Sequence, residues 1–324
     1  MTLLLFEPSA KSTALADKYG YSEWLVARFM QYVPDVERFM EKMDQSPAQY
    51  IRVNTLKTTP DALEQRLAAK GFKLEPTLLS EVLRVVKAPM ATGATNEYLF
   101  GHYYIQDLSS CMAVDALDAQ KSQSVLDMAA APGGKTTHIA QRMQNTGSIV
   151  ALEPNKRRAR SMLFNLDRLG VANTCVLCAD ALAATKDLGK FDRVLLDAPC
   201  SCEGVIARDR TRKTSHRPED VEYCAGRQEQ MLEAAISACK KGGAGIVIYS
   251  TCSFAPEENE AIVDRMVRKF GVTVEPLPHG SEGLAHFGNI EFDKSVRNAR
   301  RFYPHVHDTT GFFVAKMRVP PCPP

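Results

Sequence analysis

The most constraining feature of this chain is the stretch from Ser124 to His138, which reads S-V-L-D-M-A-A-A-P-G-G-K-T-T-H. Its apolar start, residues 124–128, predicts a buried strand, and a helix is expected from about Lys135 to Met143. The loop between them holds only Ala, Pro and Gly, so a ligand can approach its backbone closely. A strand, a small-residue loop and a helix N-terminus together form the nucleotide-binding unit of a doubly wound α/β domain.

Three kinds of ligand suit such a loop. A dinucleotide site expects G-x-G-x-x-G, and this glycine spacing is missing. A P-loop expects G-x-x-x-x-G-K-[ST], and the chain has Ala129 in place of the first glycine before Gly134-Lys135-Thr136. The third ligand is S-adenosylmethionine (SAM), whose ribose diol and adenine amine donate hydrogen bonds to acidic side chains.

Acidic residues follow the expected strands in the pattern that SAM needs. Asp127 closes the first strand, Glu153 follows the strand at 148–152, and Asp180 follows the strand at 174–178. An acid about twenty residues past the loop is well placed to bind a ribose, whereas a phosphate would be repelled. The pattern therefore favours SAM, and a P-loop ATPase stays the alternative.

Composition limits the class of protein. The 324 residues are 45% hydrophobic, enough for one large domain and a smaller one, and the net charge of +2 restricts any nucleic-acid site to a local patch. The N-terminus does not resemble a secretion signal, and no uncharged run is long enough to span a membrane. We therefore interpret the nine cysteines as reduced and expect a cytoplasmic protein.

The chain divides into two expected domains and a tail. Residues 1–102 predict a small α+β domain, with a helical region at 22–43 broken at Pro34, a helix at 60–70, and strands at 50–54, 72–76 and 82–86. Residues 103–319 predict the α/β domain, and residues 320–324 a frayed tail. The expected strands of the α/β domain lie at 124–128, 148–152, 174–178, 191–196, 244–250, 271–276 and 311–317.

The first five of these strands alternate with helices, as a parallel sheet requires, and the last two are suited to an antiparallel edge. Seven strands in this arrangement are the Rossmann-like architecture of SAM-dependent methyltransferases.

Two neighbouring strand ends carry cysteine. The fourth strand runs into Asp197-Ala-Pro-Cys200, and the fifth into Thr251-Cys252. The carboxyl ends of parallel strands share one edge of the sheet, so both thiols are expected beside the SAM site. A pyrimidine C5 is a poor nucleophile, but a thiolate added to C6 turns the ring into an enamine whose C5 attacks a methyl group. The two cysteines suit the roles of nucleophile and helper, and Asp197 suits stabilisation of the developing charge.

The helix that is expected after Cys252 bears on the pKa of its thiol. A helix is expected to begin at Pro256, and a thiol just before a helix N-terminus tends toward a lowered pKa, although Glu257 and Glu258 oppose the effect.

Cys175 and Cys178 have C-x-x-C spacing but no second pair, so we interpret them as core residues and predict no metal site.

Three basic clusters suit a phosphate backbone. They comprise Arg208, Arg210, Arg212, Lys213, His216 and Arg217, then Arg297, Arg300, Arg301, His305 and His307, and finally Arg157, Arg158 and Arg160. A base must leave its stack before a thiol reaches its C6 atom, so base flipping is implied.

Several motifs in order resemble the Nop2/Sun (NOL1/NOP2/Sun, RsmB-like) family of RNA cytosine-C5 methyltransferases. They are Arg52-Val-Asn54, Gln106-Asp-Leu-Ser-Ser110, D-M-A-A-A-P-G-G-K from Asp127, Asp197-Ala-Pro-Cys-Ser201, Tyr249-Ser-Thr-Cys-Ser253, Arg301-Phe-Tyr-Pro-His305 and Thr310-Gly-Phe-Phe313.

The resemblance implies roles that spacing alone leaves open. It makes Cys252 the nucleophile and Cys200 the residue that assists product release. It implies SAM contacts from Ala129, Ala130, Ala131, Pro132, Gly133, Gly134, Lys135, Glu153, Arg158, Asp180 and Asp197. The family usually has Gly where this chain has Cys202, which puts the conformation of that loop in question. It also implies an RRM-like N-terminal domain, and the chain leaves no room for a PUA domain.

We therefore expect a monomeric, SAM-dependent RNA methyltransferase that makes 5-methylcytosine, with tRNA as the preferred substrate and neither DNA nor membrane as a partner. The alternatives are rRNA as substrate with the same chemistry, or a non-catalytic RNA-binding or ribosome-assembly protein with a vestigial site.

Overall fold

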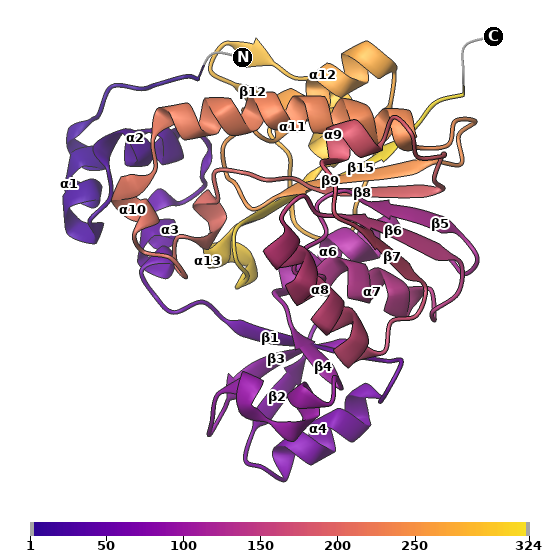
Figure 1. Ribbon diagram of the computed structural model, residues 1–324. Helices are drawn as coiled ribbons and strands as arrows, with labels where there is room; N and C mark the ends of the chain where they lie inside the picture. Colours follow the sequence, from indigo (N-terminus) through magenta and orange to yellow (C-terminus); the bar gives the residue numbers. More distant parts are fainter. Residues whose placement is uncertain (1–2, 322–324) are drawn as a thin grey trace.

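The computed structural model describes residues 3–321 (Figure 1). A small antiparallel sheet has the order β2-β3-β1-β4, formed by Lys73–Pro76, Val82–Lys87, Gln49–Val53 and Tyr103–Ile105. Helix α4 (Pro60–Ala68) begins at Pro60, after the side chain of Thr59 has capped it, and buries Leu63 and Leu67 against this sheet. The three strands and the helix predicted here are confirmed.

The large sheet has the order β11-β14-β15-β9-β8-β5-β6-β7. Its parallel part is β5 (Ser124–Asp127), β6 (Ser148–Leu152), β7 (Thr174–Leu177), β8 (Arg193–Asp197) and β9 (Ile246–Thr251). β15 (Phe312–Arg318) adds to β9 in the antiparallel sense, and β10 (Thr273–Glu275) pairs with β15. All seven predicted strands are present, with bounds that differ by up to two residues.

The prediction of seven strands is nevertheless too low. β14 (Arg300–Phe302) and β11 (Ser281–Glu282) extend the antiparallel edge and make a nine-stranded sheet. Both strands are very short and rich in charged residues, so no alternation of apolar and polar residues marked them.

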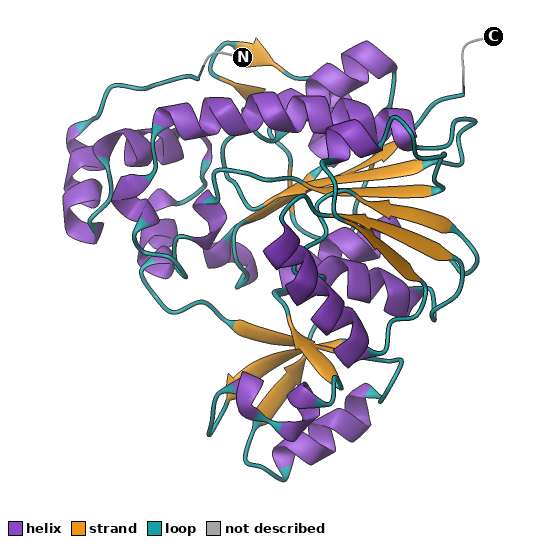
Figure 2. Cartoon of the chain, in the orientation of Figure 1, coloured by secondary structure: helices purple, strands orange, loops and turns teal. Residues whose placement is uncertain are grey.

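Helices cover both faces of the large sheet, as Figure 2 shows. One layer is α6 (Leu108–Leu117), α7 (Gly134–Arg142) and α8 (Lys156–Leu169), and the other is α9 (Ala181–Ala184), α11 (Pro218–Ala238) and α12 (Glu260–Phe270). Successive side chains of a strand point to opposite faces of the sheet, so each face needs its own cover. In β5, Val125 packs with apolar residues of α6 and α7, and Leu126 belongs to the hydrophobic cluster that includes residues of α11 and α12.

The N-terminal helices α1 (Ala10–Tyr19), α2 (Glu23–Tyr32) and α3 (Val36–Met43) pack beside the large sheet, not on the small one (Figure 1). The break near Pro34 is confirmed, whereas α1 was not predicted. The ring centroids of Phe39 and Phe254 lie 5.2 Å apart inside the main core. The division at residue 102 stays a prediction, but these helices share the larger core and β4, just beyond residue 102, belongs to the small sheet.

Arg52 of β1 ties the small sheet to α7. Its buried guanidinium donates to Gly134 O at 2.9 Å and to Thr137 Oγ1 at 2.8 Å. Asn54 Nδ2 also donates to Leu169 O at 2.8 Å, at the end of α8. These bonds fix the small sheet against the two helices that flank the small-residue loop.

Two expectations for local structure are wrong. Helix α12 begins at Glu260, not Pro256, because residues 256–259 form turns. In these turns Glu257 bonds to Arg28 of α2, and Glu258 bonds to Ser201 in the loop after β8. Cys175 and Cys178 are exposed, not buried, because β7 is the edge strand of the sheet.

The remaining elements are short. They are η1 (Thr92–Ala94), α5 (Asn96–Leu99), η2 (Glu203–Val205), α10 (Arg212–Ser215), β12 (His286–Phe287), β13 (Ile290–Glu291), η3 (Lys294–Asn298) and α13 (Pro304–His307). Among the described residues, no helix has the length and apolar character needed to cross a membrane. Of the tail expected at 320–324, residues 322–324 lie outside the described part of the chain.

Candidate active site

A cleft of about 320 Å³ lies at the carboxyl ends of β5, β8 and β9. The loop after β5 forms one wall through Ala129, Ala130, Ala131, Pro132, Gly134 and Lys135. Asp197 and Cys252 line the same cleft, so the structure brings together the loop, the predicted acid and one predicted thiol.

The loop after β5 is held close to its neighbours. Ala130 N–H donates to Leu152 O at 2.9 Å, which ties the loop to β6. Gly133 caps α7 with φ +98°, a conformation that glycine adopts without strain. A Cβ atom on Gly133 would contact Met162 of α8, so this residue faces the protein and does not line the cleft.

Asp127 lies beneath this loop and is 1% exposed. Thr136 Oγ1 donates to its Oδ2 at 2.6 Å, while Oδ1 is buried without a hydrogen-bond partner among the described residues. Burial raises the pKa of Asp127 to about 6.

Glu153 and Arg158 form a pair behind the loop. Arg158 Nη1 lies 3.2 Å from Glu153 Oε2, and Nη2 donates to Ala131 O at 2.8 Å. Asp180 caps α9 by accepting from Leu182 N–H at 2.8 Å, and it pairs with Arg227. These three predicted residues do not line the cleft itself.

Lys135 and Asp197 form an ion pair across the cleft floor, with Lys135 Nζ 2.6 Å from Asp197 Oδ2. Burial, the largest single cause, lowers the pKa of Lys135. The charge and hydrogen bond of Asp197 together with the charges of Asp127 and Cys252 outweigh burial, so the net shift is upward. Ser250 Oγ donates to the other oxygen of Asp197 at 2.8 Å, a partner that sequence reasoning missed although it sits in the Y-S-T-C motif.

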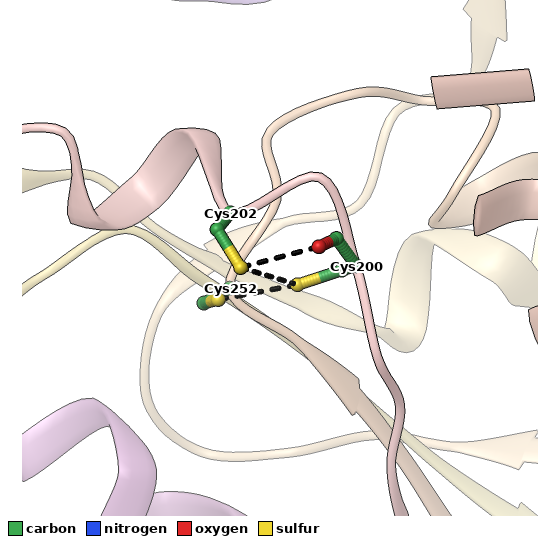
Figure 3. A group of neighbouring side chains, drawn as sticks. All are labelled: Cys200, Cys202 and Cys252. Atoms are coloured by element: carbon green, nitrogen blue, oxygen red, sulfur yellow. Dashed lines mark hydrogen bonds between the residues drawn. The ribbon is translucent and has the colours of Figure 1, made fainter. Parts of the chain in front are cut away.

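Three cysteines meet at the ends of β8 and β9 (Figure 3). The Sγ atoms of Cys200 and Cys252 are 3.1 Å apart, and those of Cys200 and Cys202 are 3.9 Å apart. Cys202 has φ +64° and its Sγ lies 3.1 Å from Cys200 O. The residue that departs from the usual family pattern thus joins the pair of thiols that the sequence predicted.

The pKa values of two of these thiols are shifted in opposite directions. The contact with Cys200 lowers the pKa of Cys252, but Cys202 and burial outweigh it, so the pKa lies well above its usual range. Hydrogen bonds from the other two thiols lower the pKa of Cys202. The tendency toward a lowered pKa at Cys252 is therefore not met, because no helix begins at Pro256 and because Cys202 and partial burial raise the pKa of the thiol.

Glu258 holds the two cysteine loops together, and sequence reasoning missed it as a site residue. It is fully buried and accepts from Ser201 N–H at 2.9 Å, from Ser201 Oγ, from Ser253 Oγ at 2.6 Å and from Gln228 Nε2 at 2.7 Å. Ser201 follows Cys200 and Ser253 follows Cys252. Burial and the charge of Glu203 raise the pKa of Glu258 to about 7.

The predicted basic clusters are only partly available. Arg301 is buried and pairs with Glu260, and Lys213 pairs with Asp44 at 2.8 Å, so both are structural. Arg208 reaches the cleft and pairs with Asp107 at 3.0 Å. The arginines that remain exposed are Arg157, Arg158, Arg160, Arg208, Arg210, Arg217 and Arg297.

A doubly wound sheet with a small-residue loop and a cleft at its strand ends defines a protein of the Rossmann-like methyltransferase class. The chain belongs to the 16S rRNA methyltransferase RsmB/F family, whose model matches residues 114–318. A second model, the ferredoxin-like domain of RsmF/B-like methyltransferases, matches residues 21–91. The predicted family and fold class are thereby confirmed.

Relatives and solved structures agree with this assignment. The chain is 42% identical over 313 residues to a mouse 28S rRNA (cytosine-C(5))-methyltransferase, an alignment that covers 94% of this chain and 39% of the relative. A methyltransferase homolog from Pyrococcus horikoshii superposes with a TM-score of 0.88 at 37% identity, covering 96% of this chain and 99% of that one.

NSun6 from Pyrococcus horikoshii, solved with SFG, superposes with a TM-score of 0.77 at 28% identity, covering 96% of this chain and 98% of that one. The chain spans about half or less of the length of the eukaryotic curated relatives that it matches.

Proposed function

We propose that this protein is a SAM-dependent RNA (cytosine-C5)-methyltransferase that acts on rRNA. The observation that carries the proposal is the pair of thiols, Cys200 and Cys252, whose Sγ atoms lie 3.1 Å apart at the edge of the cleft that Asp197 lines. A methyl acceptor with its own lone pair needs no thiol, whereas a pyrimidine C5 needs a covalent bond at C6.

The residues present fit SAM as the cofactor. Asp127 Oδ1 and Gln106 Oε1 are two of the buried polar atoms that have no hydrogen-bond partner among residues 3–321, and Gln106 lines the cleft. Acceptor oxygens of this kind suit a ligand that carries hydroxyl and amine donors. We propose that Asp197 and the loop from Ala129 to Lys135 hold SAM in the cleft, where Gly133 shapes the loop without lining the cleft. We further propose that SAM, which supplies an electrophilic methyl group when bound, extends beyond the cleft to Glu153, Arg158 and Asp180.

In the proposed reaction, the Cys252 thiol releases its proton to water, and the thiolate Sγ forms a bond to C6 of a flipped cytosine. Asp197 stabilises the charge that develops on the ring, and C5 becomes nucleophilic. After methyl transfer the C5 proton passes to water, and the electron pair of that bond restores the double bond between C5 and C6. The bond from Sγ to C6 breaks at the same time, and its electron pair returns to Cys252 Sγ. Cys200, in contact with Cys252, assists this release.

The substrate class follows from what the comparisons name. The name of the matching family refers to 16S rRNA, and the name of the mouse relative refers to 28S rRNA. The preference for tRNA has no support among them, so rRNA is the better proposal. A cytoplasmic location and a monomeric state stay predictions.

The experiment incubates purified protein with methyl-labelled SAM and unmodified rRNA or tRNA in separate reactions, followed by bisulfite mapping. We expect label at C5 of one cytosine in rRNA. The Cys252→Ala variant serves as the control. Label in tRNA alone would overturn the substrate class, and SAM binding without label in either RNA would support a vestigial site.

A further inference from the structure

We propose that Cys200, Cys202 and Cys252 form a binding site for a thiophilic divalent cation such as Zn²⁺. The site lies on the thiols of the proposed function, so the bound cation would hold the methyltransferase in a reversible inactive state. Among residues 3–321, these three form the only group of His, Cys, Asp or Glu side chains whose ligand atoms lie close enough together, within 4.8 Å of one another.

The spacing of the sulfur atoms suits a thiolate site. A Zn–S bond of about 2.3 Å at tetrahedral angles puts neighbouring sulfurs about 3.8 Å apart. The pair Cys200 and Cys202 is 3.9 Å apart, and the pair Cys200 and Cys252 is 3.1 Å apart. Of these two pairs, only the second must separate, and rotation of one half-buried thiol would provide that movement.

Neighbouring bonds hold the three ligands in place before a cation arrives. Ser201, between Cys200 and Cys202, bonds to Glu258 through its N–H and Oγ, and Arg212 Nη1 donates to Ser201 O at 3.1 Å. Gly204 N–H donates to Cys252 O at 2.7 Å, which joins the two loops. A loop fixed in this way loses little conformational entropy when it binds a cation.

Cys202 is the residue that turns a pair of thiols into a three-ligand site. Its left-handed backbone is the conformation that glycine favours, yet the side chain present brings a third sulfur toward the other two (Figure 3).

Three protein ligands leave a fourth position open. Because Cys252 lines the cleft, a cation and its water can reach the site from there. Each thiol would release its proton to solvent as its bond to the cation forms. While Cys252 Sγ is bonded to the cation, it is not free to attack C6 of a base, so the cation must leave before the reaction can start.

The test titrates chelator-treated, reduced protein with Cd²⁺ and follows the ultraviolet thiolate-to-metal charge-transfer band, with Zn²⁺ as the competing ion. We expect one cation per chain, with the intensity of three thiolates. Cys202→Gly should weaken binding roughly a hundredfold, since losing a ligand costs at least as much as losing a residue that supports one. The matched control is Cys175→Ser, an exposed cysteine on β7 whose loss should change nothing.

The methylation rate is then compared with and without Zn²⁺ for each variant. Zn²⁺ should inhibit the unmodified protein, EDTA should reverse it, and Cys202→Gly should resist. No charge-transfer band, or equal affinity in Cys202→Gly with unchanged thermal unfolding, would overturn the site. A metal-free protein without methylation would count only against the proposed function, because the band is measured without RNA.

Discussion

Cys200 Sγ and Cys252 Sγ lie 3.1 Å apart, although 52 positions of the chain separate the two residues. Adjacent parallel strands produce this contact, because β8 and β9 end at the same edge of the sheet. Both thiols are therefore close enough to take part in the successive steps of the proposed reaction.

The first prediction separates the roles of these thiols. Cys252→Ala should abolish methylation, because no bond to C6 can form, while Cys200→Ala should accumulate a covalent complex of protein and RNA, because release fails. Denaturing electrophoresis with labelled RNA detects the complex. A Cys200→Ala variant that turns over without such a complex would refute the assignment.

The second prediction concerns pH and Glu258. Its pKa rises from an ordinary 4.5 to about 7 in the folded protein, so the folded state binds the extra proton between these values. Its contribution to the free energy of unfolding is therefore present at low pH and declines as pH rises from about 4.5 to 7, by up to about 3 kcal/mol.

Urea unfolding at several pH values checks this effect. As pH rises, the free energy of unfolding of the unmodified protein should fall relative to that of Glu258→Gln. Asp127 is present in both proteins, so its similar pH dependence cancels when the two free energies are subtracted. Parallel stability curves across this range would contradict the prediction.

The third prediction concerns Gly204, which lies between the loops of Cys252 and Gly311. A Cβ atom there would lie 2.4 Å from Gly311 O and 2.7 Å from Cys252 O. Gly204→Ala should therefore destabilise the fold by about 1–3 kcal/mol and lower methylation by moving Cys252. Gly226→Ala is the matched control. Apart from its chain neighbours and the backbone of its own helix α11, no described atom lies within 4 Å of its Cβ position, so the variant should be more stable by up to about 1 kcal/mol. Similar unfolding midpoints for the two variants would contradict this account.

The fourth prediction tests the buried pair that joins α2 to the main core. Arg28 Nη2 lies 2.7 Å from Glu257 Oε2, and both side chains are at most 1% exposed. Arg28→Met should cost about 3–5 kcal/mol, because Glu257 would remain charged and buried. Lys11→Met removes the exposed pair with Glu37 and should cost less than about 1 kcal/mol. Chemical denaturation measures both, and equal losses would refute the structural role of the buried pair.

Local sequence patterns predicted the strands that line the cleft and both cysteine-bearing loops. The reason is that each strand end and the loop after β5 are short contiguous segments with strong periodicity or composition. The departure at Cys202 was visible in the sequence, but its contact with Cys200 depends on a left-handed backbone that no pattern announces.

Long-range pairing explains what could not be predicted. Glu258 bonds to Ser201, which lies 57 positions earlier in the chain. The sequence predicts Glu258 in the first turn of a helix, whereas residues 256–259 form turns in the structure. Likewise, Arg301 appears available to RNA in the sequence, whereas its partner Glu260 lies 41 positions away.

The bond from Arg52 to the first turn of α7 limits how this molecule can move. Because the guanidinium is buried and joins β1 to Gly134 and Thr137, the small sheet has no free hinge at this contact. If RNA docks on the small sheet, no swinging arm can then carry it to Cys252. In that case the protein would act as a fixed frame, and the target base of the proposed reaction would cover the remaining distance by its own rotation out of the strand.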